Sequence, residues 1–333
     1  MQTVSRYISR IGAAAILAVV GTAPALAEVV IRAQTGLPRN HDLVQSFFKH
    51  FVEPLNAKAK GVVQIHYVGG PEVTSPRKVG AALRRGAIEM LNSPAAYYAG
   101  AVPQAQALMA SNLSTKQIRE RGGFDVIRSV WSEKLNAHVL AWPERAAQYN
   151  LFFVREPKVG GPAGLDLSGF KMRSTSAYRP LISALGATPV GVVPQEMHTA
   201  LQRGMVDGFG WPNVALTAMG VTELVKYWVE PPFYHLANLL LMNQDRWKAL
   251  PEKVRTTLAQ GAMEYEQNSN KDIEKMQDDQ RAALKAAGAR PIRLEGAEAQ
   301  AYLSAAYDSM WRRIGETLSP EELQAIRPKL YSE

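Results

Sequence analysis

Residues 166–213 alternate between strand-forming and helix-forming segments, and this alternation leaves few folds open to the chain. The predicted segments are, in order, a strand over 169–173, a helix over 174–185, a strand over 188–193, a helix over 195–203 and a strand from 205. Gly186 and Gly204 end the two helices, and the hydroxyl residues at 174–176 are candidate N-caps of the first helix. Strands joined by helices in this way form parallel sheets, so the block predicts an α/β fold.

Arg173 and Trp211 fall at the ends of two of these predicted strands. In open α/β sheets, small ligands bind at the carboxyl ends of the parallel strands, where helix N-termini favour anions. The sequence therefore predicts a ligand site at this edge of the sheet.

The first hundred residues repeat the same order of strands and helices. The predicted segments are a strand over 28–34, a helix over 42–60 capped by Asp42, a strand over 62–68, a helix over 76–85 and a strand over 87–91. Asn92-Ser93-Pro94 then predicts a helix start with Pro94 at the first helical position. Two such units predict two similar lobes with a cleft between their carboxyl edges.

Four polar or aromatic residues of the first unit are expected to face this cleft: Asn92, Ser93, Tyr97 and Tyr98. Asparagine and serine are also frequent helix caps, and of two adjacent tyrosines on a helix one usually packs in the core. We therefore expect one of the two tyrosines to contact ligand. Thr35, in the turn after the first strand, and Asn150, on a strand entering the second lobe, complete the candidates from this half.

The rest of the chain predicts one long helix and several shorter elements. Those elements are a helical region over 104–130, strands over 137–140 and 149–154, a short helix over 222–228, a strand over 236–242, a strand over 290–294 and a helix over 297–314. Residues 251–287 form a single helical pattern in which Gly261 is the weak point. A helix of this length extends about 55 Å, so we expect it to run along both lobes.

The N-terminus has the three parts of a secretory signal peptide. Arg6 and Arg10 precede an apolar run over 11–20, and Ala25-Leu26-Ala27 is a small-residue cleavage site, so residues 1–27 are predicted to be removed. The alternative, a membrane anchor or buried helix, is disfavoured because the run is well short of the roughly 20 residues that span a bilayer. The chain has no cysteine, which excludes disulfides and thiolate zinc sites. The sequence predicts a soluble periplasmic protein.

Motifs for catalysis, cofactors and nucleic acid are missing from the sequence. It contains no G-x-S-x-G, H-E-x-x-H, Walker or G-x-G-x-x-G motif, and its six histidines lack metal-ligand spacing. The formal charge of +8 is dispersed among acidic residues, without the basic runs typical of nucleic-acid binding. We therefore expect a protein that is not an enzyme and that uses no cofactor. No metal ligands are predicted, and assistance of ligand binding by a cation stays an open alternative. An exported hydrolase stays a minor alternative.

Arg173 is the strongest candidate binding residue. An arginine at a strand end, followed by hydroxyl residues, suits bidentate binding of a carboxylate. The alternative is an interlobe salt bridge to an acidic residue. Phe209 and Trp211 alternate with glycines at the next strand end and form an apolar wall if they project into the cleft. Their alternative is an ordinary place in the core.

Four sequence segments resemble the extracytoplasmic solute-binding proteins of tripartite ATP-independent periplasmic (TRAP) transporters. They are Leu167-Ser-Gly-Phe-Lys-Met-Arg173, Leu185-Gly-Ala-Thr-Pro189, Pro194-Gln-Glu196 and Thr199-Ala-Leu-Gln-Arg-Gly-Met-Val-Asp-Gly208. The likeness extends from Ala33 to the long helix and covers most of the chain. It implies a two-lobed periplasmic binding protein with a long hinge-spanning helix, whose first lobe comprises 28–148 plus 236–276 and whose second comprises 149–235 plus 277–333.

The resemblance also implies a ligand and partners. Arg173 matches the family arginine that pairs with the carboxylate of an organic acid, and the loaded protein hands that acid to TRAP membrane permease subunits driven by an ion gradient. A periplasmic sensory receptor with the same fold is the alternative.

Two departures from the family pattern concern the ligand. Many relatives carry a second arginine about twenty residues before the first, whereas here Arg145 is displaced from that position. Phe209 and Trp211 stand where relatives usually have polar residues. A second ligand carboxylate would lack its partner, so we expect a monocarboxylate with an apolar, hydroxylated or aromatic body. A C4-dicarboxylate or a sugar acid is the alternative.

Overall fold

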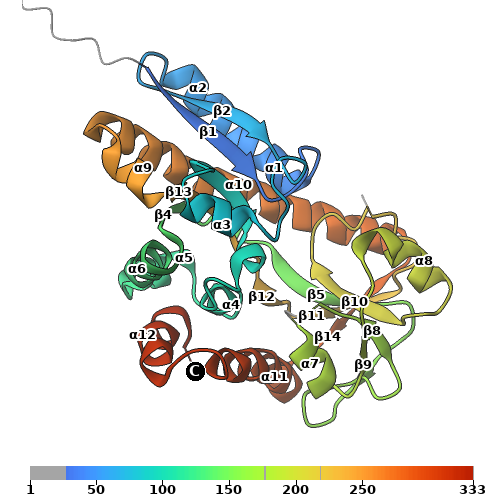
Figure 1. Ribbon diagram of the computed structural model, residues 1–333. Coiled ribbons are helices and arrows are strands. Elements are labelled where there is room, and N and C mark those ends of the chain that lie inside the picture. Colours follow the sequence, from blue (N-terminus) through green and yellow to red (C-terminus); the bar gives the residue numbers. More distant parts are fainter. Residues whose placement is uncertain (1–27, 176–177, 218, 333) are drawn as a thin grey trace, which may run out of the picture.

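The computed structural model describes residues 28–175, 178–217 and 219–332, which form an α/β protein built on two main sheets (Figure 1). The predicted signal peptide, 1–27, and the candidate cap Ser176 lie outside these residues. None of the helices in the described ranges has both the length and the apolar character that crossing a membrane requires.

The first sheet has five strands in the order β2-β1-β3-β13-β4. Their bounds are β1 (Val29–Thr35), β2 (Val63–Gly69), β3 (Met90–Pro94), β4 (Ala137–Ala141) and β13 (Asn238–Asn243). β1 pairs in parallel with β2 and β3, and β13 pairs antiparallel with β3 and β4. All six residues of β13 are buried, as the apolar run over 239–242 predicts for a central strand.

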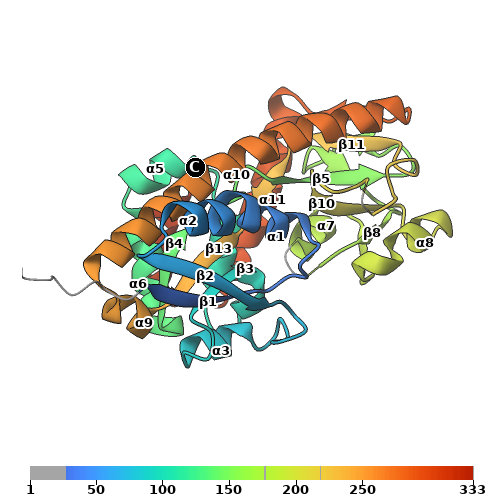
Figure 2. The same cartoon turned by 90° about the horizontal axis from the view of Figure 1, so that it is seen from above.

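Helices from three parts of the chain surround this sheet. They are α1 (Asp42–Phe47), the π-helical segment η1 (Phe48–Val52), α2 (Glu53–Lys58), α3 (Val79–Arg84), the 3₁₀ turn η2 (Ala95–Tyr98), α4 (Ala105–Met109), α5 (Thr115–Glu120), α6 (Gly123–Leu135) and α9 (Gln244–Ala249). In Figure 2, α1 lies at the end of this lobe that is nearest to the second sheet.

The second sheet follows the order β14-β11-β5-β10-β8-β9, with β12 paired to β5. Its strands are β5 (Gln148–Phe153), β8 (Lys171–Arg173), β9 (Thr188–Val190), β10 (Gly208–Pro212), β11 (Tyr227–Glu230), β12 (Phe233–His235) and β14 (Arg290–Arg293). Its helices are α7 (Arg179–Ala184), the 3₁₀ turn η3 (Pro194–Glu196), α8 (Met197–Gln202) and α11 (Gly296–Gly315). β6 (Lys158–Val159) and β7 (Leu165–Asp166) form a separate small ribbon. β8 pairs in parallel with β9 and β10, as the strand–helix–strand pattern predicts.

α10 (Glu252–Ala286) runs alongside both sheets (Figure 2). Its first half contributes Leu258 and Tyr265 to the core beneath the first sheet, and Leu284 near its end enters the core beneath the second. Gly261 allows close packing, since a Cβ there would lie 2.8 Å from Cδ1 of Leu55. The long spanning helix predicted from the sequence is therefore present, and its glycine is the point of closest approach to α2.

Polar side chains on the buried face of α10 bind the chain where it crosses between the sheets. Glu266 accepts the backbone N–H of Trp142 at 3.0 Å, and Asn270 accepts that of Ala146 at 2.7 Å. Gln277 donates to the carbonyl oxygen of Ala146 at 2.6 Å. An irregular buried segment needs such partners for its backbone groups, and α10 supplies them.

α12 (Pro320–Leu330) ends the described chain and packs against α4 and α6. The division made from the sequence placed 277–333 with the second lobe and 28–148 with the first. α12 thus contacts helices of the other predicted lobe, and α11 contacts α4 of that lobe as well as α7 and β12 of its own.

Three predicted helix starts are wrong. The helix after Arg173 begins at Arg179 rather than near 174, because the backbone N–H of Ser174 donates to Val190 and continues the pairing with β9. Asn92-Ser93-Pro94 completes β3, since β13 pairs with all three residues, and the helical turn η2 starts one residue later than predicted, at Ala95. His41, not Asp42, caps α1, and its Nδ1 accepts the N–H of Leu43 at 3.2 Å.

The helix predicted over 222–228 is not formed: residues 222–224 make a turn, and no residue of the range is helical. Tyr227 and Trp228 belong to β11, which pairs with β14 and β5. Trp228 and Val229 are buried there, and aromatic and β-branched residues suit a strand between two neighbours.

Candidate functional site

A cavity of about 570 Å³ lies between the two lobes, at the carboxyl ends of β8 and β10. α1, the turn before it and η2 line the cavity from the first lobe, β5, β8 and β10 line it from the second, and α10 closes one side. This is the edge at which the sequence predicted a ligand site.

Arg173, the last residue of β8, is 3% exposed and lines this cavity. Its Nε donates to the carbonyl oxygen of Val192 at 3.0 Å, and its Nη1 donates to the hydroxyl of Tyr178 at 2.6 Å. No ion pair among the described residues involves Arg173. A buried guanidinium without a counter-ion is costly, so this cation is poised for an anion from outside the protein.

Tyr178 fixes the position of the guanidinium. Its hydroxyl, which accepts from Arg173, donates in turn to the carbonyl oxygen of Gly210 at 2.7 Å. A Cβ on Gly210 would lie 2.7 Å from the Tyr178 ring, so glycine is required for the ring to rest on β10. These bonds hold Arg173 at the strand end, with donors left over for a ligand.

Aromatic rings flank the guanidinium within the cavity. The Trp211 ring centroid is 5.1 Å from the Arg173 Cζ, within cation–π range. Tyr149 lines the same space, its ring 6.0 Å from that of Tyr178, and burial raises the pKa of Tyr149, which keeps it neutral. Tyr97 faces the cavity from the first lobe, and burial raises its pKa as well. The walls next to the cation are thus largely aromatic.

The opposite wall carries ionisable groups. Lys49 and Asp272 both line the cavity and form an ion pair with each other, and Nε2 of His50 lies 2.7 Å from the same Asp272 carboxylate. His41 also lines the cavity, and burial lowers its pKa. Lys49 is 64% exposed, so the charge on this side is solvated and already paired.

The structure brings three of the nine predicted site residues together at the cavity: Arg173, Trp211 and Tyr97. The other six do not line it: Thr35, Asn92, Ser93, Tyr98, Asn150 and Phe209. Phe209 is fully buried and stacks on Phe152 at 5.3 Å, because it lies two residues further back along β10 than Trp211. Tyr98 packs edge-on against Trp131, so Tyr97 is the member of the pair that reaches the cavity.

The remaining predicted residues are occupied by protein partners. The Thr35 hydroxyl donates to Leu37 at 2.7 Å, and the Asn92 amide donates to the hydroxyl of Tyr265 at 3.1 Å. Ser93 is fully buried and its hydroxyl donates to the carbonyl oxygen of Pro94. Asn150 donates to the carbonyl oxygen of Val229 at 2.7 Å.

Arg145, which the sequence placed off the family position, lies outside the cavity. Its guanidinium, 5% exposed in total, donates to the Ser111 hydroxyl at 3.2 Å and to the Leu113 carbonyl oxygen. His235 Nδ1 lies 2.9 Å from its carbonyl oxygen. Arg145 therefore ties the crossing segment to the first lobe and supplies no second cation to the cavity.

Glu144 is a buried carboxyl behind the first-lobe wall that the sequence reading missed. It is fully buried and accepts from Ser46 at 2.8 Å, from Tyr265 at 2.8 Å and from Asn238 at 2.9 Å. Burial raises the pKa of Glu144 to about 7, because three neutral donors only partly offset the loss of solvent. Nothing in the local sequence signals this burial, which arises from packing between α1, β13 and α10.

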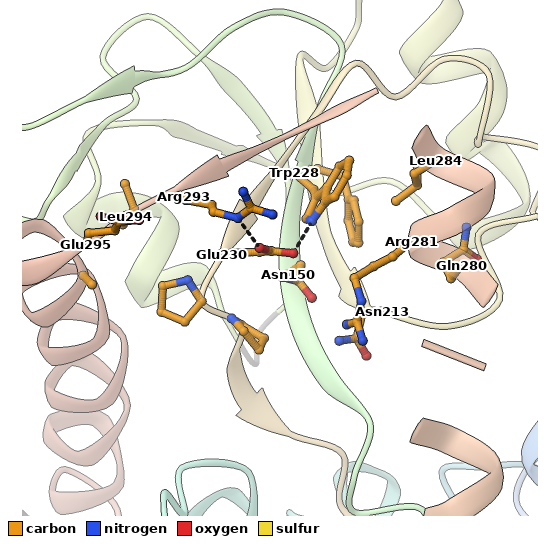
Figure 3. A pocket seen from close by; sticks show the side chains of 14 residues that line it. Asn150, Asn213, Trp228, Glu230, Gln280, Arg281, Leu284, Arg293, Leu294 and Glu295 are labelled. Carbon is orange, nitrogen blue, oxygen red and sulfur yellow. Dashed lines mark hydrogen bonds and ion pairs between the residues drawn. The ribbon is translucent and has the colours of Figure 1, made fainter. Parts of the chain in front are cut away.

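Figure 3 shows a second cavity, of about 400 Å³, between α10, β11 and the start of α11. Glu230 lies at its centre, where it accepts from Nε1 of Trp228 at 2.9 Å and pairs with Arg293 at 3.4 Å. Arg281, on its rim, pairs with Asp278 at 2.6 Å. Both arginines here already have carboxylate partners, so the interlobe cavity is the better candidate for an anion site.

The family model of bacterial extracellular solute-binding proteins, family 7 (DctP), matches residues 34–317. The C4-dicarboxylate-binding periplasmic protein DctP of Rhodobacter capsulatus is 30% identical over 161 residues, which make up 46% of this chain and 48% of that protein. The chain thus spans about half the length of the first curated relatives that it matches.

Solved structures share the fold over nearly the whole chain. A TRAP periplasmic solute-binding protein from Ochrobactrum anthropi superposes with a TM-score of 0.76 at 20% identity, covering 91% of this chain and 95% of that one. One from Roseobacter denitrificans with bound L-galactonate gives a TM-score of 0.68 at 20% identity, covering 90% and 99%. Since the family model spans well over half of its length, the chain belongs to the DctP family, family 7 of the bacterial extracellular solute-binding proteins.

Proposed function

We propose that this protein captures a monocarboxylic acid in the interlobe cavity and delivers it, in the periplasm, to the membrane permease subunits of a TRAP transporter. The observation that carries the proposal is Arg173, a buried cavity-lining cation with two protein acceptors and no carboxylate partner among the described residues. A ligand carboxylate can take the remaining guanidinium donors.

The ligand body is proposed to be apolar, aromatic or hydroxylated. Trp211, Tyr149 and Tyr97 offer aromatic surface beside the cation, and a ring stacked there gains beyond simple burial. A sugar acid, such as the L-galactonate bound by the Roseobacter denitrificans protein, stays an alternative ligand; it shares the single carboxylate and the hydroxyl groups with this class.

A C4-dicarboxylate is the second candidate, favoured by the name of the Rhodobacter capsulatus relative and by Lys49 at the cavity wall. Lys49 is exposed and already paired with Asp272, however, so a second ligand carboxylate would have to displace that partner. This competition favours the monocarboxylate.

The test combines two measurements. Mass spectrometry of acid co-purified with the native protein identifies the ligand, and calorimetry measures its affinity for wild type, Arg173→Ala and Arg173→Lys. We expect Arg173→Ala to weaken binding at least a hundredfold, since about 3 kcal/mol of charge-assisted hydrogen bonding is lost.

Arg179→Ala is the matched control, because Arg179 is exposed on α7 and does not line the cavity. If Arg173→Ala keeps the affinity of wild type, the arginine is not the carboxylate anchor. If succinate and malate bind while lactate, mandelate and cinnamate do not, the monocarboxylate proposal fails.

A further inference from the structure

The hydroxyl of Ser46, which lines the interlobe cavity from α1, has its single proton committed inside the protein. Its Oγ donates to Oε1 of Glu144 at 2.8 Å. Above pH 7, where Glu144 is ionised, its carboxylate can only accept, so the proton in this hydrogen bond belongs to Ser46. A serine oxygen has one proton and two lone pairs, so towards the cavity Ser46 can only accept.

Ser269 on α10 repeats this arrangement on the neighbouring part of the wall. Its hydroxyl donates to the carbonyl oxygen of Glu266 at 3.3 Å and accepts the backbone N–H of Glu144 at 3.2 Å. The hydroxyls of both cavity-lining serines on this side therefore donate to acceptors within the protein. Asp42 and Asp272, which line the same wall, add carboxylate oxygens that also accept.

Arg173 and Ser46 thus have opposite hydrogen-bonding character. Arg173 presents donors that require an acceptor, and Ser46 presents a lone pair that requires a donor. Lys49 and His41 carry donors on the Ser46 side, but Lys49 is paired with Asp272. A ligand that is acceptor-rich at both ends would face Ser46 with oxygen against oxygen.

We propose that Ser46, held as an acceptor by Glu144, binds a hydroxyl group of the bound acid and makes the cavity select acids that carry a hydroxyl away from their carboxylate. This inference rests on the proposed binding of the carboxylate by Arg173. It narrows the ligand from monocarboxylates in general to hydroxy acids, with Ser46 as the discriminating contact and Glu144 as the residue that positions its proton.

The experiment uses two pairs of acids that differ by one hydroxyl: 4-hydroxybutyrate with butyrate, and 4-hydroxyphenylacetate with phenylacetate. Calorimetry at pH 8, where Glu144 is ionised, gives the affinity of each acid for wild type, Ser46→Ala and the control Ser304→Ala, whose serine is exposed on α11. Wild type and the control are expected to prefer the hydroxy acid of at least one pair by about fivefold to tenfold, the worth of one good hydrogen bond.

Ser46→Ala is expected to reduce this preference to within about twofold while the affinity for the unsubstituted acid stays near that of wild type. A purely structural role for Ser46 would lower both affinities together. The ratio of the two affinities therefore separates recognition of the hydroxyl from damage to the wall.

Glu144 is tested by two substitutions with opposite expectations. Glu144→Gln keeps an amide oxygen that can accept from Ser46, so the hydroxyl preference is expected to survive. Glu144→Ala frees the Ser46 proton to turn towards the cavity, so the preference is expected to fall while unsubstituted acids still bind. Should Glu144→Ala not fold, Ser46→Ala still decides the question.

Two results overturn the inference. One is the absence of any hydroxyl preference in wild type; the other is a preference that Ser46→Ala leaves intact. Either can occur with Arg173→Ala abolishing the binding of every acid, in which case the proposed function stands and only the Ser46 contact fails. If Arg173→Ala leaves binding unchanged, the proposed function itself fails.

Discussion

Replacing Glu144 by glutamine should change how the stability of this protein depends on pH. Burial raises the pKa of Glu144 from 4.5 to about 7 in the folded protein. The folded state therefore holds its proton over a pH range in which the unfolded chain has lost it, and folding stability falls as pH rises through that range. The contribution is fully present below pH 4.5 and is lost as pH passes 7.

The magnitude follows from the difference between the folded pKa of about 7 and the ordinary value of 4.5. Each unit corresponds to about 1.4 kcal/mol, so ionising this buried carboxyl removes about 3 kcal/mol, of which some 2 to 3 kcal/mol is lost between pH 5 and pH 8. The glutamine amide does not titrate. It keeps an oxygen for Ser46 and Tyr265. Its nitrogen replaces the oxygen that accepts from Nδ2 of Asn238 at 2.9 Å, so the Asn238 amide has to turn over and accept through its oxygen, which has no partner in the wild-type structure.

Urea denaturation of wild type and Glu144→Gln at pH 5 and pH 8 measures this effect. The stability of the variant relative to wild type should rise by about 2 to 3 kcal/mol from pH 5 to pH 8, because all other titrating groups cancel in the difference. Glu133→Gln, on the exposed face of α6, is the control. If the Glu144→Gln difference is the same at both pH values, Glu144 does not titrate in this range and the reasoning is refuted.

Two glycine substitutions test the packing around the cavity and the long helix. Gly210→Ala would place a Cβ 2.7 Å from the Tyr178 ring, which positions Arg173, so we expect it to weaken acid binding about tenfold or more by calorimetry. The control is Gly191→Ala, whose Cβ would have no atom within 4 Å and which should leave binding unchanged. Gly261→Ala gains about 1 kcal/mol of helix propensity, but its Cβ would lie 2.8 Å from Leu55, and such overpacking costs about 1–3 kcal/mol. We therefore expect the variant to be less stable than wild type in urea unfolding. A more stable variant would show that Leu55 can move aside without cost.

Sequence patterns predicted most of the elements that build the cavity. The strand–helix periodicity placed Arg173 and Trp211 at the ends of two parallel strands, which pair with each other in the structure. The charged pattern over 251–287 predicted α10 almost to its observed bounds. These features are predictable because their signals are local: the glycines that end helices and the alternation of strands and helices both depend on residues close together in the sequence.

Residues whose place depends on tertiary contacts were not predictable in this way. Ser46 lies on a helix assigned from its aromatic spacing, and only the packing of that helix against Glu144 and α10 turns its hydroxyl into a cavity acceptor. Phe209 and Trp211 share a strand and an alternation pattern, yet a distance of two residues decides that one is core and the other wall. The local sequence predicts a helix at Tyr227 and Trp228, but these residues form a strand because they pair with β14, which lies more than sixty residues later in the chain.

The continuity of α10 has a consequence for folding. The helix is a single hydrogen-bonded rod of 35 residues, about 53 Å long, and it contributes Tyr265 to one lobe's core and Leu284 to the other's. If either lobe unfolded, the half of α10 that packs against it would lose the tertiary contacts that stabilise the helix. The lobes are therefore expected to melt together, as one calorimetric transition in which the van't Hoff and calorimetric enthalpies agree, and a proline placed in the middle of α10 should split that transition in two.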